Sequence, residues 1–387
     1  MIYFDNAATT KVIDEVAELT LKYMTENYGN PSSLHRMGLN AEKGVKSARG
    51  LIAKRLGAKP EQIIFTSGGT EGNNTVILGI ARDRAKFGKH LITTTIEHPS
   101  VLNCFELLES EGFEVTYLPV NQEGIVMQES LKSALRPDTQ LVSIMMVNNE
   151  LGSIQPIADL GAVLKSSDYQ GYFHSDGTQA LGKLKLNFTS LPLDFFTAAA
   201  HKCHGPKGVG FIYARSGRLP KAYMIGGGQE SNQRSGTHNT AGIVGMAKAI
   251  DMVYADFESS RQKISEFSIK IRSYFEDYGD SCRVYTPQLE KSVPHIIDVA
   301  FKHLKAEVLL HTLEKYGIMV SSGSACSTNK QLKVSHVLSA IGAKQEFIDG
   351  AIRISMSKLT TEEEVNHLIM TLDKVLPELQ AVTGRRF

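Results

Sequence analysis

The spacing of apolar residues along the chain predicts strands that alternate with helices. Short apolar runs at 62–66 and 91–96 have the length and residue types of buried strands. Between such runs, apolar residues recur every three or four positions, as at Val45, Ala48 and Ile52, which is the pattern of an amphipathic helix. Further strands are expected at 113–120, 141–147, 172–176, 195–200 and 208–214. An alternation of this length favours a mainly parallel sheet with helices on both faces.

The pattern changes after position 256 and predicts a second, smaller unit of the α+β type. Its expected elements are helices at 257–278, near 307–313 and at 362–376, and a strand at 294–301. The fold class is therefore expected to be α/β, with a large domain at 14–256 that holds a mainly parallel seven-stranded sheet. The small α+β domain is expected to combine residues 1–13 with residues 257–387.

Charge and composition exclude several classes of function. The chain of 387 residues has 42 Lys and Arg against 41 Asp and Glu, so a nucleic-acid or membrane surface is not expected. No apolar segment has the length of a membrane span, and the first residues enter a strand-like stretch, so we expect a cytoplasmic protein. The four cysteines are far apart without a CxxC pair, which argues against a zinc site or a disulfide framework within the chain.

Polar side chains follow five of the expected strands at the point where each strand ends. These residues are Thr70, His98, Asn149, Asp176 with Gln179, and Lys202. The carboxyl ends of parallel strands meet at one edge of the sheet, where ligands of such folds bind. Each residue alone also fits an ordinary role, such as a helix cap or a turn. Their grouping favours a cofactor site.

Lys202 lies between an apolar strand and a turn at 205–208 that is rich in Gly and Pro, so its amine is expected in a crevice. Partial burial lowers the pKa of an ammonium, and the free amine can form a Schiff base with an aldehyde such as pyridoxal 5'-phosphate. The alternative is an ordinary surface turn. The glycine turn at 67–70, between a strand and a helix, fits a phosphate site, although many α/β proteins have such a turn without a ligand.

Cys326 lies among small residues at 321–329, which predict an exposed, mobile loop. A thiol in such a loop can carry a group between two places. Free cysteines are more often buried, and we expect Cys104, Cys203 and Cys282 to be of that kind.

Several ordered motifs resemble the cysteine desulfurases of the NifS/IscS type, within the class V aminotransferase group of pyridoxal-phosphate enzymes. The motifs lie at 5–10, 29–33, 66–71, 97–98, 147–150, 201–202, 205–208, 234–237, 322–326 and 335–338. The resemblance therefore extends over nearly the whole chain, and it implies an aspartate-aminotransferase-like fold. The stretch that carries Cys326 is similar to the group with a long cysteine loop.

The resemblance implies a role for each residue around the cofactor ring. Lys202 would bind pyridoxal 5'-phosphate as a Schiff base and later move the Cα proton of the substrate. His98 would stack on the ring and take part in proton transfer. Asp176 would pair with the ring nitrogen and keep it protonated, and Gln179 would contact the ring hydroxyl.

The resemblance also implies a phosphate site that is shared between two subunits. Gly69, Thr70 and His201 of one subunit would hold the phosphate, together with Thr237 from the partner subunit of a homodimer.

The substrate implied by the resemblance is L-cysteine. Asn149 and Arg353 would bind its carboxylate, and the Cys326 thiolate would attack its sulfur. The products would be L-alanine and a persulfide on Cys326, whose sulfur would pass to an acceptor such as an iron-sulfur scaffold or a tRNA-thiolating enzyme. Cys326, Lys202 and His98 are the expected catalytic residues.

Two positions depart from the pattern of that family. Ala199 replaces the usual Ser or Thr, which predicts a hold on the cofactor that is weaker by about 1 kcal/mol for one missing hydrogen bond. The loop at 229–233 lacks a basic residue often found there, which bears on contacts with a partner.

Three other functions stay open at this point. A selenocysteine lyase can share the cysteine loop, whereas another class V aminotransferase has no need of Cys326. A non-catalytic sulfur-relay scaffold would keep the fold and the carrier cysteine, but the presence of Lys202, His98 and Asp176 argues against it.

Overall fold

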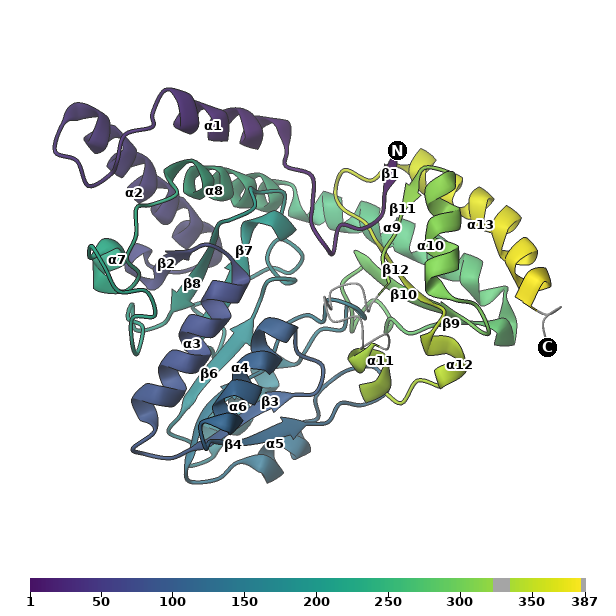
Figure 1. Ribbon diagram of the computed structural model, residues 1–387, viewed down its shortest axis with the longest axis horizontal. Coiled ribbons are helices and arrows are strands. Elements are labelled where there is room, and N and C mark those ends of the chain that lie inside the picture. The colour runs from purple at the N-terminus through teal and green to yellow at the C-terminus, as the bar shows by residue number, and fades with distance from the viewer. Residues whose placement is uncertain (323–334, 384–387) are drawn as a thin grey trace.

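The structure is a computed structural model, and it describes residues 1–322 and 335–383. Two units lie side by side, and the smaller one carries both ends of the chain (Figure 1). The larger unit is built on a seven-stranded sheet. The expected loop around Cys326 lies outside the described residues.

The seven-stranded sheet has the order β2-β8-β7-β6-β5-β3-β4. Its strands are β2 (Ile63–Thr66), β3 (His90–Thr94), β4 (Glu114–Leu118), β5 (Thr139–Ser143), β6 (Tyr172–Asp176), β7 (Phe195–Ala199) and β8 (Gly210–Ala214). Only β8 runs antiparallel to its neighbours, and the other pairs are parallel. The predicted α/β class with a mainly parallel seven-stranded sheet is therefore confirmed.

Alternate side chains of the strands point to opposite faces of the sheet, and helices cover both faces. Ile64 packs with α3 (Gly69–Arg84) and α4 (Pro99–Ser110) on one face. Phe65 faces the other side, which is covered by four helices. These are α2 (Arg36–Leu56), α5 (Gln128–Ala134), α6 (Ile157–Ser166) and α8 (Thr240–Ala255). Burial on both faces explains why the strands read as continuous apolar runs.

The smaller unit has its own apolar core between three long helices and two small sheets. The helices are α9 (Phe257–Glu276), α10 (Ala306–Lys315) and α13 (Glu362–Thr383), and the sheets are β12-β10-β9 and β1-β11. Their strands are β1 (Ile2–Tyr3), β9 (Cys282–Val284), β10 (Ile296–Phe301), β11 (Ile318–Met319) and β12 (Ala351–Ser355). The first residues thus pair with this unit, as expected. The domain boundaries at 13/14 and 256/257 stay a prediction.

The remaining helices are short or peripheral. They are α1 (Asp14–Thr25), α7 (Gln229–Asn232), α11 (His336–Ala340) and α12 (Gln345–Ile348). An apolar cluster that includes Ile96, Met145, Leu151, Val337 and Leu338 joins α11 to the large unit. None of the described helices combines the length and the apolar character that a bilayer span requires.

The strand that leads to Lys202 ends one residue earlier than expected. β7 stops at Ala199, and residues Ala200–Lys202 form the 3₁₀ turn η2. The carbonyl of Ala200 accepts hydrogen bonds from the backbone N–H groups of Cys203 and Gly205, so it closes a turn and no longer bonds to the sheet. This turn directs the side chains of His201 and Lys202 away from the strand.

We predict that the aromatic cluster under β7 and β8 is a main source of stability for the large unit. Phe188 is fully buried, stacks on Tyr213 and meets Phe196 edge to face. Phe188→Ala should lower the free energy of unfolding by about 3–5 kcal/mol because it leaves a cavity. Urea denaturation checks this, with Phe87→Ala as a control, since Phe87 is 60% exposed. Equal midpoints for the two variants would contradict the prediction.

Candidate active site

A cavity of about 260 Å³ lies at the carboxyl ends of the parallel strands, between the two units. Its walls contain Ala7, Gly69, Thr70, His98, Ser100, Met145, Val147, Asn149, Asp176, Thr178, Gln179, Ala199, His201, Lys202 and Arg353. Nine of the residues singled out from the sequence thus line one cavity. Thr237 is exposed and does not line it, and Cys326 lies outside the described residues.

The first turn of α3 forms an anion cradle in one wall. The helix begins at Gly69, and no side chain caps its first N–H groups. A Cβ at position 69 would lie 2.8 Å from Oγ1 of Thr178, so only glycine lets the backbone lie this close. That hydroxyl is buried and has no hydrogen-bond partner among the described residues. Free N–H groups at a helix start, with an unpartnered hydroxyl beside them, suit a phosphate group.

Asp176 places a buried carboxylate at the end of β6. Its Oδ2 accepts a hydrogen bond of 2.7 Å from Nδ2 of Asn73, and its Oδ1 accepts one of 2.9 Å from the backbone N–H of Thr178. Both donors are neutral, and Asp176 forms no ion pair within the described part of the chain. A buried carboxylate without a cation is costly, so this site favours a ligand that brings positive charge, such as a protonated ring nitrogen.

His98 is held as a neutral imidazole by the same network. Asn73 Nδ2 also donates to Oγ of Ser100 at 2.9 Å, and that hydroxyl lies 2.9 Å from Nδ1 of His98. Nδ1 accepts from the backbone N–H of Ser100 as well, at 3.1 Å, which assigns the ring proton to Nε2. Burial lowers the pKa of His98, an effect that outweighs the opposing charge of Asp176. The ring therefore offers a neutral face and one N–H donor.

Lys202 reaches back to the N-terminal segment. Its Nζ donates to the carbonyl oxygens of Ala7 and Ala8 at 2.5 and 2.8 Å. Nε2 of Gln179 donates to the same Ala7 carbonyl at 2.8 Å. The amine is thus placed in the cavity wall beside Gln179.

His201 lies next to Lys202 and contacts Oγ1 of Thr9 through Nδ1 at 3.2 Å. Burial and the nearby Lys202 charge lower the pKa of His201 to about 4, so its ring is neutral near pH 7.

Arg353 brings a guanidinium from β12 of the small unit. Its side chain is buried, donates to the carbonyl of Asn149 at 2.8 Å, and pairs with Asp5 at 3.0 Å. Nε is buried without a partner among the described residues. Asp298 lies opposite in β10, and burial raises the pKa of its carboxyl well above the usual range. Asp5 therefore pairs with Arg353 from one side, and the guanidinium also lines the cavity, where it can bind a substrate carboxylate.

Sequence reasoning did not select Asn73, Ser100 or Asp5, which orient the selected residues. Asn73 is one helical turn after Gly69, so its face of α3 could have indicated it. The partner of each of these polar groups comes from a distant segment, and no local pattern indicates that pairing.

Comparisons with known proteins match this architecture. Residues 2–368 match the aminotransferase class-V family. The chain is 41% identical over 386 residues to the cysteine desulfurase IscS of Dictyoglomus turgidum, and the match covers 99% of this chain and 96% of that protein. The solved structure of a NifS-like protein superposes with a TM-score of 0.92 at 38% identity, covering 98% of this chain and all of the other.

A third comparison is the structure of SspA in complex with cysteine, with a TM-score of 0.81 and 35% identity over 93% of this chain and 100% of that one. These matches show that the protein belongs to the aminotransferase class-V family. It depends on pyridoxal 5'-phosphate, as do the enzymes of that family that it resembles.

We predict that restoring a hydroxyl at position 199 strengthens cofactor binding. Ala199 is buried in the cavity wall, and its Cβ lies 3.9 Å from a Cβ built at Gly69, beside the anion cradle. Ala199→Ser should add one hydrogen bond, which is about 1 kcal/mol or about fivefold in the cofactor dissociation constant. Cofactor absorbance after dialysis measures this. Equal retention by the wild type and the variant would show that position 199 does not contact the phosphate or its surroundings.

Proposed function

We propose that the protein is a pyridoxal-phosphate-dependent cysteine desulfurase, which converts L-cysteine to L-alanine and passes the sulfur to an acceptor protein through Cys326. The observation that carries the proposal is the convergence of an amine, a buried carboxylate and a buried guanidinium on one cavity. The names of the similar proteins, cysteine desulfurase and a protein bound to cysteine, point to the same substrate.

The residues present fit the cofactor at each of its polar groups. The amine of Lys202 matches the aldehyde, Asp176 matches the ring nitrogen, and Gln179 matches the ring hydroxyl. The start of α3 at Gly69 and Thr70, with His201, matches the phosphate. When bound, the cofactor supplies an electron-withdrawing ring that stabilises negative charge at the substrate Cα.

The protein's own residues then control where protons lie. The Asp176 carboxylate keeps the ring nitrogen protonated because the ion pair removes the cost of burying its charge. Nζ of Lys202 would take the proton from Cα of the substrate, and Nε2 of His98, which carries the ring proton, would be a proton donor in the same cavity. Burial keeps His98 neutral, and because Nδ1 is engaged by Ser100, the ring acts through its Nε2–H donor.

Arg353 and Asn149 orient the substrate through its carboxylate. A guanidinium binds a carboxylate with two parallel hydrogen bonds, and Arg353 lines the cavity beside Asn149. The ion pair between Arg353 and Asp5 holds the guanidinium in place before the substrate arrives.

The segment that carries Cys326 leaves and re-enters the described chain beside this cavity. Ser321 exchanges backbone hydrogen bonds with Arg353, and the hydroxyl of Ser335 donates to the Glu150 carboxylate at 2.5 Å. Cys326 is four residues beyond Ser322, and four residues span at most about 14 Å when extended. These anchors support Cys326 as the residue that meets the substrate sulfur.

The sulfur transfer balances as one bond formed and one broken. The Cys326 thiolate forms a bond to the sulfur of L-cysteine while the carbon–sulfur bond breaks. The electron pair of that bond stays with carbon, which takes a proton and becomes the methyl group of alanine. The persulfide on Cys326 then passes its outer sulfur to the acceptor. An iron-sulfur scaffold and a tRNA-thiolating enzyme are both acceptors of this chemical class.

A homodimer would complete the phosphate site with Thr237 of a second copy. Thr237 is exposed and belongs to a loop whose Ser235 N–H bonds to the carbonyl of Met224. Beside it, Tyr223 and Ile225 expose apolar side chains, Ile225 to 90%. An exposed apolar segment next to a predicted cofactor contact supports burial against a partner subunit.

Borohydride treatment of the loaded enzyme is predicted to make the bond between the cofactor and Lys202 irreversible. Mass spectrometry should then find the added mass on the peptide that contains Lys202. Lys202→Ala should lose both the added mass and the yellow colour. Lys207→Ala removes an exposed lysine of the same turn and should keep both. Cofactor mass on any other lysine would refute the role of Lys202.

Cys326→Ser is predicted to bind the cofactor and L-cysteine but to release no sulfide in the presence of a thiol reductant. The hydroxyl of serine is too weak a nucleophile toward sulfur to replace the thiolate. Absorbance reports cofactor and substrate binding, and a colorimetric assay reports sulfide. Cys282→Ser is the matched control, because Cys282 is half-buried in β9 of the small unit and should be dispensable. Unchanged sulfide release by Cys326→Ser would remove Cys326 from the mechanism.

A further inference from the structure

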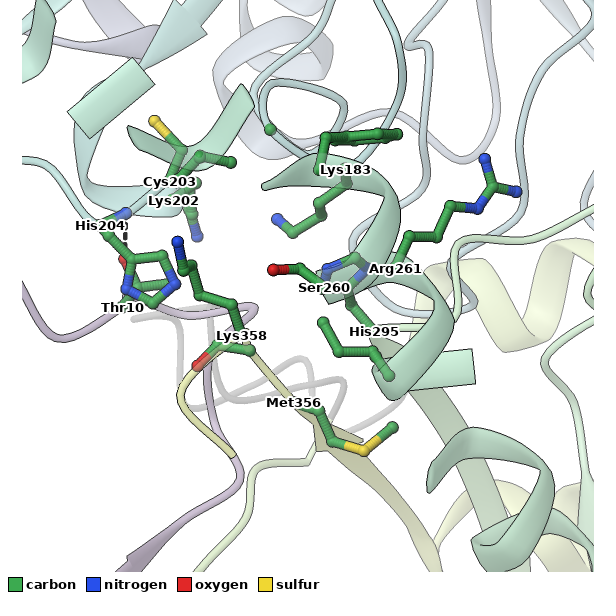
Figure 2. Close-up of a pocket in the computed structure, with 15 residues that line it drawn as sticks. Thr10, Lys183, Lys202, Cys203, His204, Ser260, Arg261, His295, Met356 and Lys358 are labelled. Atoms are coloured by element: carbon green, nitrogen blue, oxygen red, sulfur yellow. Dashed lines mark hydrogen bonds between the residues drawn. The ribbon is translucent and has the colours of Figure 1, made fainter. Parts of the chain in front are cut away.

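A second, smaller cavity of about 30 Å³ lies behind Lys202, on the side of α9 and the end of β12 (Figure 2). Lys183, Ser260 and His295 point into it from one side, and His204 and Lys358 face it from the other. None of these five side chains lines the larger cavity. It is therefore a separate site, and Lys202 lies between the two cavities and lines both of them.

The ionisable side chains that line this smaller cavity are basic, apart from the thiol of Cys203. The lining contains three lysines, two histidines and one arginine, and no lining residue carries a carboxylate. Asp256, which is outside the lining, pairs with Nζ of Lys358 at 2.8 Å. A cavity with this composition attracts negative charge.

Lys183 has a buried amine that lacks a counter-ion in the described structure. The side chain is 5% exposed, and its Nζ has one hydrogen-bond acceptor there, Oε1 of Gln179 at 2.7 Å. An ammonium has three donors, and its charge is costly to bury unless it is paired. Burial, reinforced by the nearby Lys202 charge, lowers the pKa of Lys183 to about 7. An anion in the cavity would accept the remaining donors and keep the amine charged.

Two neutral groups complete a shell of donors. His295 is buried, and its Nδ1 has no hydrogen-bond partner among the described residues. The hydroxyl of Ser260 points toward the same space (Figure 2). The volume holds about two water molecules or one monatomic anion.

We propose that this cavity binds a single monatomic, monovalent anion, which is chloride under physiological conditions. Lys183 supplies the charge, and Ser260 and His295 supply further donors. The site goes beyond the proposed desulfurase activity and does not depend on it. Because Lys183 also donates to Gln179, an occupied site links chloride to the wall of the cofactor cavity.

The anion should bind more weakly as pH rises, because Lys183 then loses the charge that it contributes to the cavity. Several titratable or charged groups surround Lys183. From the large unit they are Lys202, Cys203 and His204, and from α9 and the small unit they are Arg261, His295, Arg353 and Lys358, the last of which is paired with Asp256. Burial lowers the pKa of His204 to about 4 and that of His295 to about 3, and raises that of Cys203 to about 12. These three groups therefore keep one charge state between pH 6 and pH 9.

Bromide diffraction tests the proposal directly. Crystals of the cofactor-loaded protein, soaked in bromide at pH 6, should show an anomalous peak within hydrogen-bond distance of Lys183 Nζ. Lys183→Met should lose the peak. Lys185→Met is the matched control, since Lys185 lies two residues away in an exposed ion pair with Glu258, and it should keep the peak. Water alone in the wild-type cavity, or an unchanged peak in Lys183→Met, would overturn the proposal.

A solution measurement keeps the test independent of whether Lys183→Met folds. Chloride binding to the wild type, followed by the line width of its ³⁵Cl resonance and displaced by bromide, should weaken about tenfold per pH unit above the pKa of Lys183. The dissociation constant should therefore rise by at least tenfold between pH 6 and pH 9. A constant affinity over this range, or no displaceable broadening at pH 6, would also overturn the proposal.

Discussion

The burial of the Asp176 carboxylate at the end of β6 is the constraint on which the cofactor cavity depends. Two neutral donors hold it, one from Asn73 of α3 and one from the backbone of Thr178, so both carboxylate oxygens accept a hydrogen bond while the charge has no ion-pair partner among the described residues. Through Asn73 and Ser100 the same network fixes the orientation and tautomer of His98. A buried negative charge without a cation favours a cationic ring above it, and the neutral His98 does not compete for that place.

The junction of the two units adds two things to the cofactor cavity of the large unit: a guanidinium for the substrate carboxylate and acceptors for the Lys202 amine. Arg353 comes from β12, and its side chain pairs with Asp5, whose backbone forms a bridge with Ser355 of the same strand. The carbonyl groups of Ala7 and Ala8, on the same N-terminal segment, accept hydrogen bonds from Lys202. The N-terminal segment therefore connects the small unit to the amine of the large unit. A displacement of one unit would move Arg353 relative to Lys202, and the spacing between the substrate carboxylate site and the reacting carbon would change.

Much of the fold and of the site could be predicted from local patterns. Apolar runs that are buried on both faces indicated the seven strands, and the glycine turn before α3 indicated the anion cradle at Gly69. Lys202 was recognisable because an apolar strand leads directly to it. Asn73 and Lys183 were not recognisable in this way, since each lies in a segment whose local pattern is that of an ordinary helix or turn. Their importance comes from distant partners, Asp176 for the first and the basic cavity behind Lys202 for the second.

The sequence by itself determined the alternation of strands and helices, the strand ends that carry polar residues, and a resemblance that the family match confirms. These features are local, because side-chain periodicity and turn residues act over a few positions along the chain. Only the tertiary structure decided the strand order, the antiparallel β8, the neutral state of His98 and the basic wall around Lys183. Those depend on which distant groups are buried together, since desolvation and charge act through space and not along the sequence.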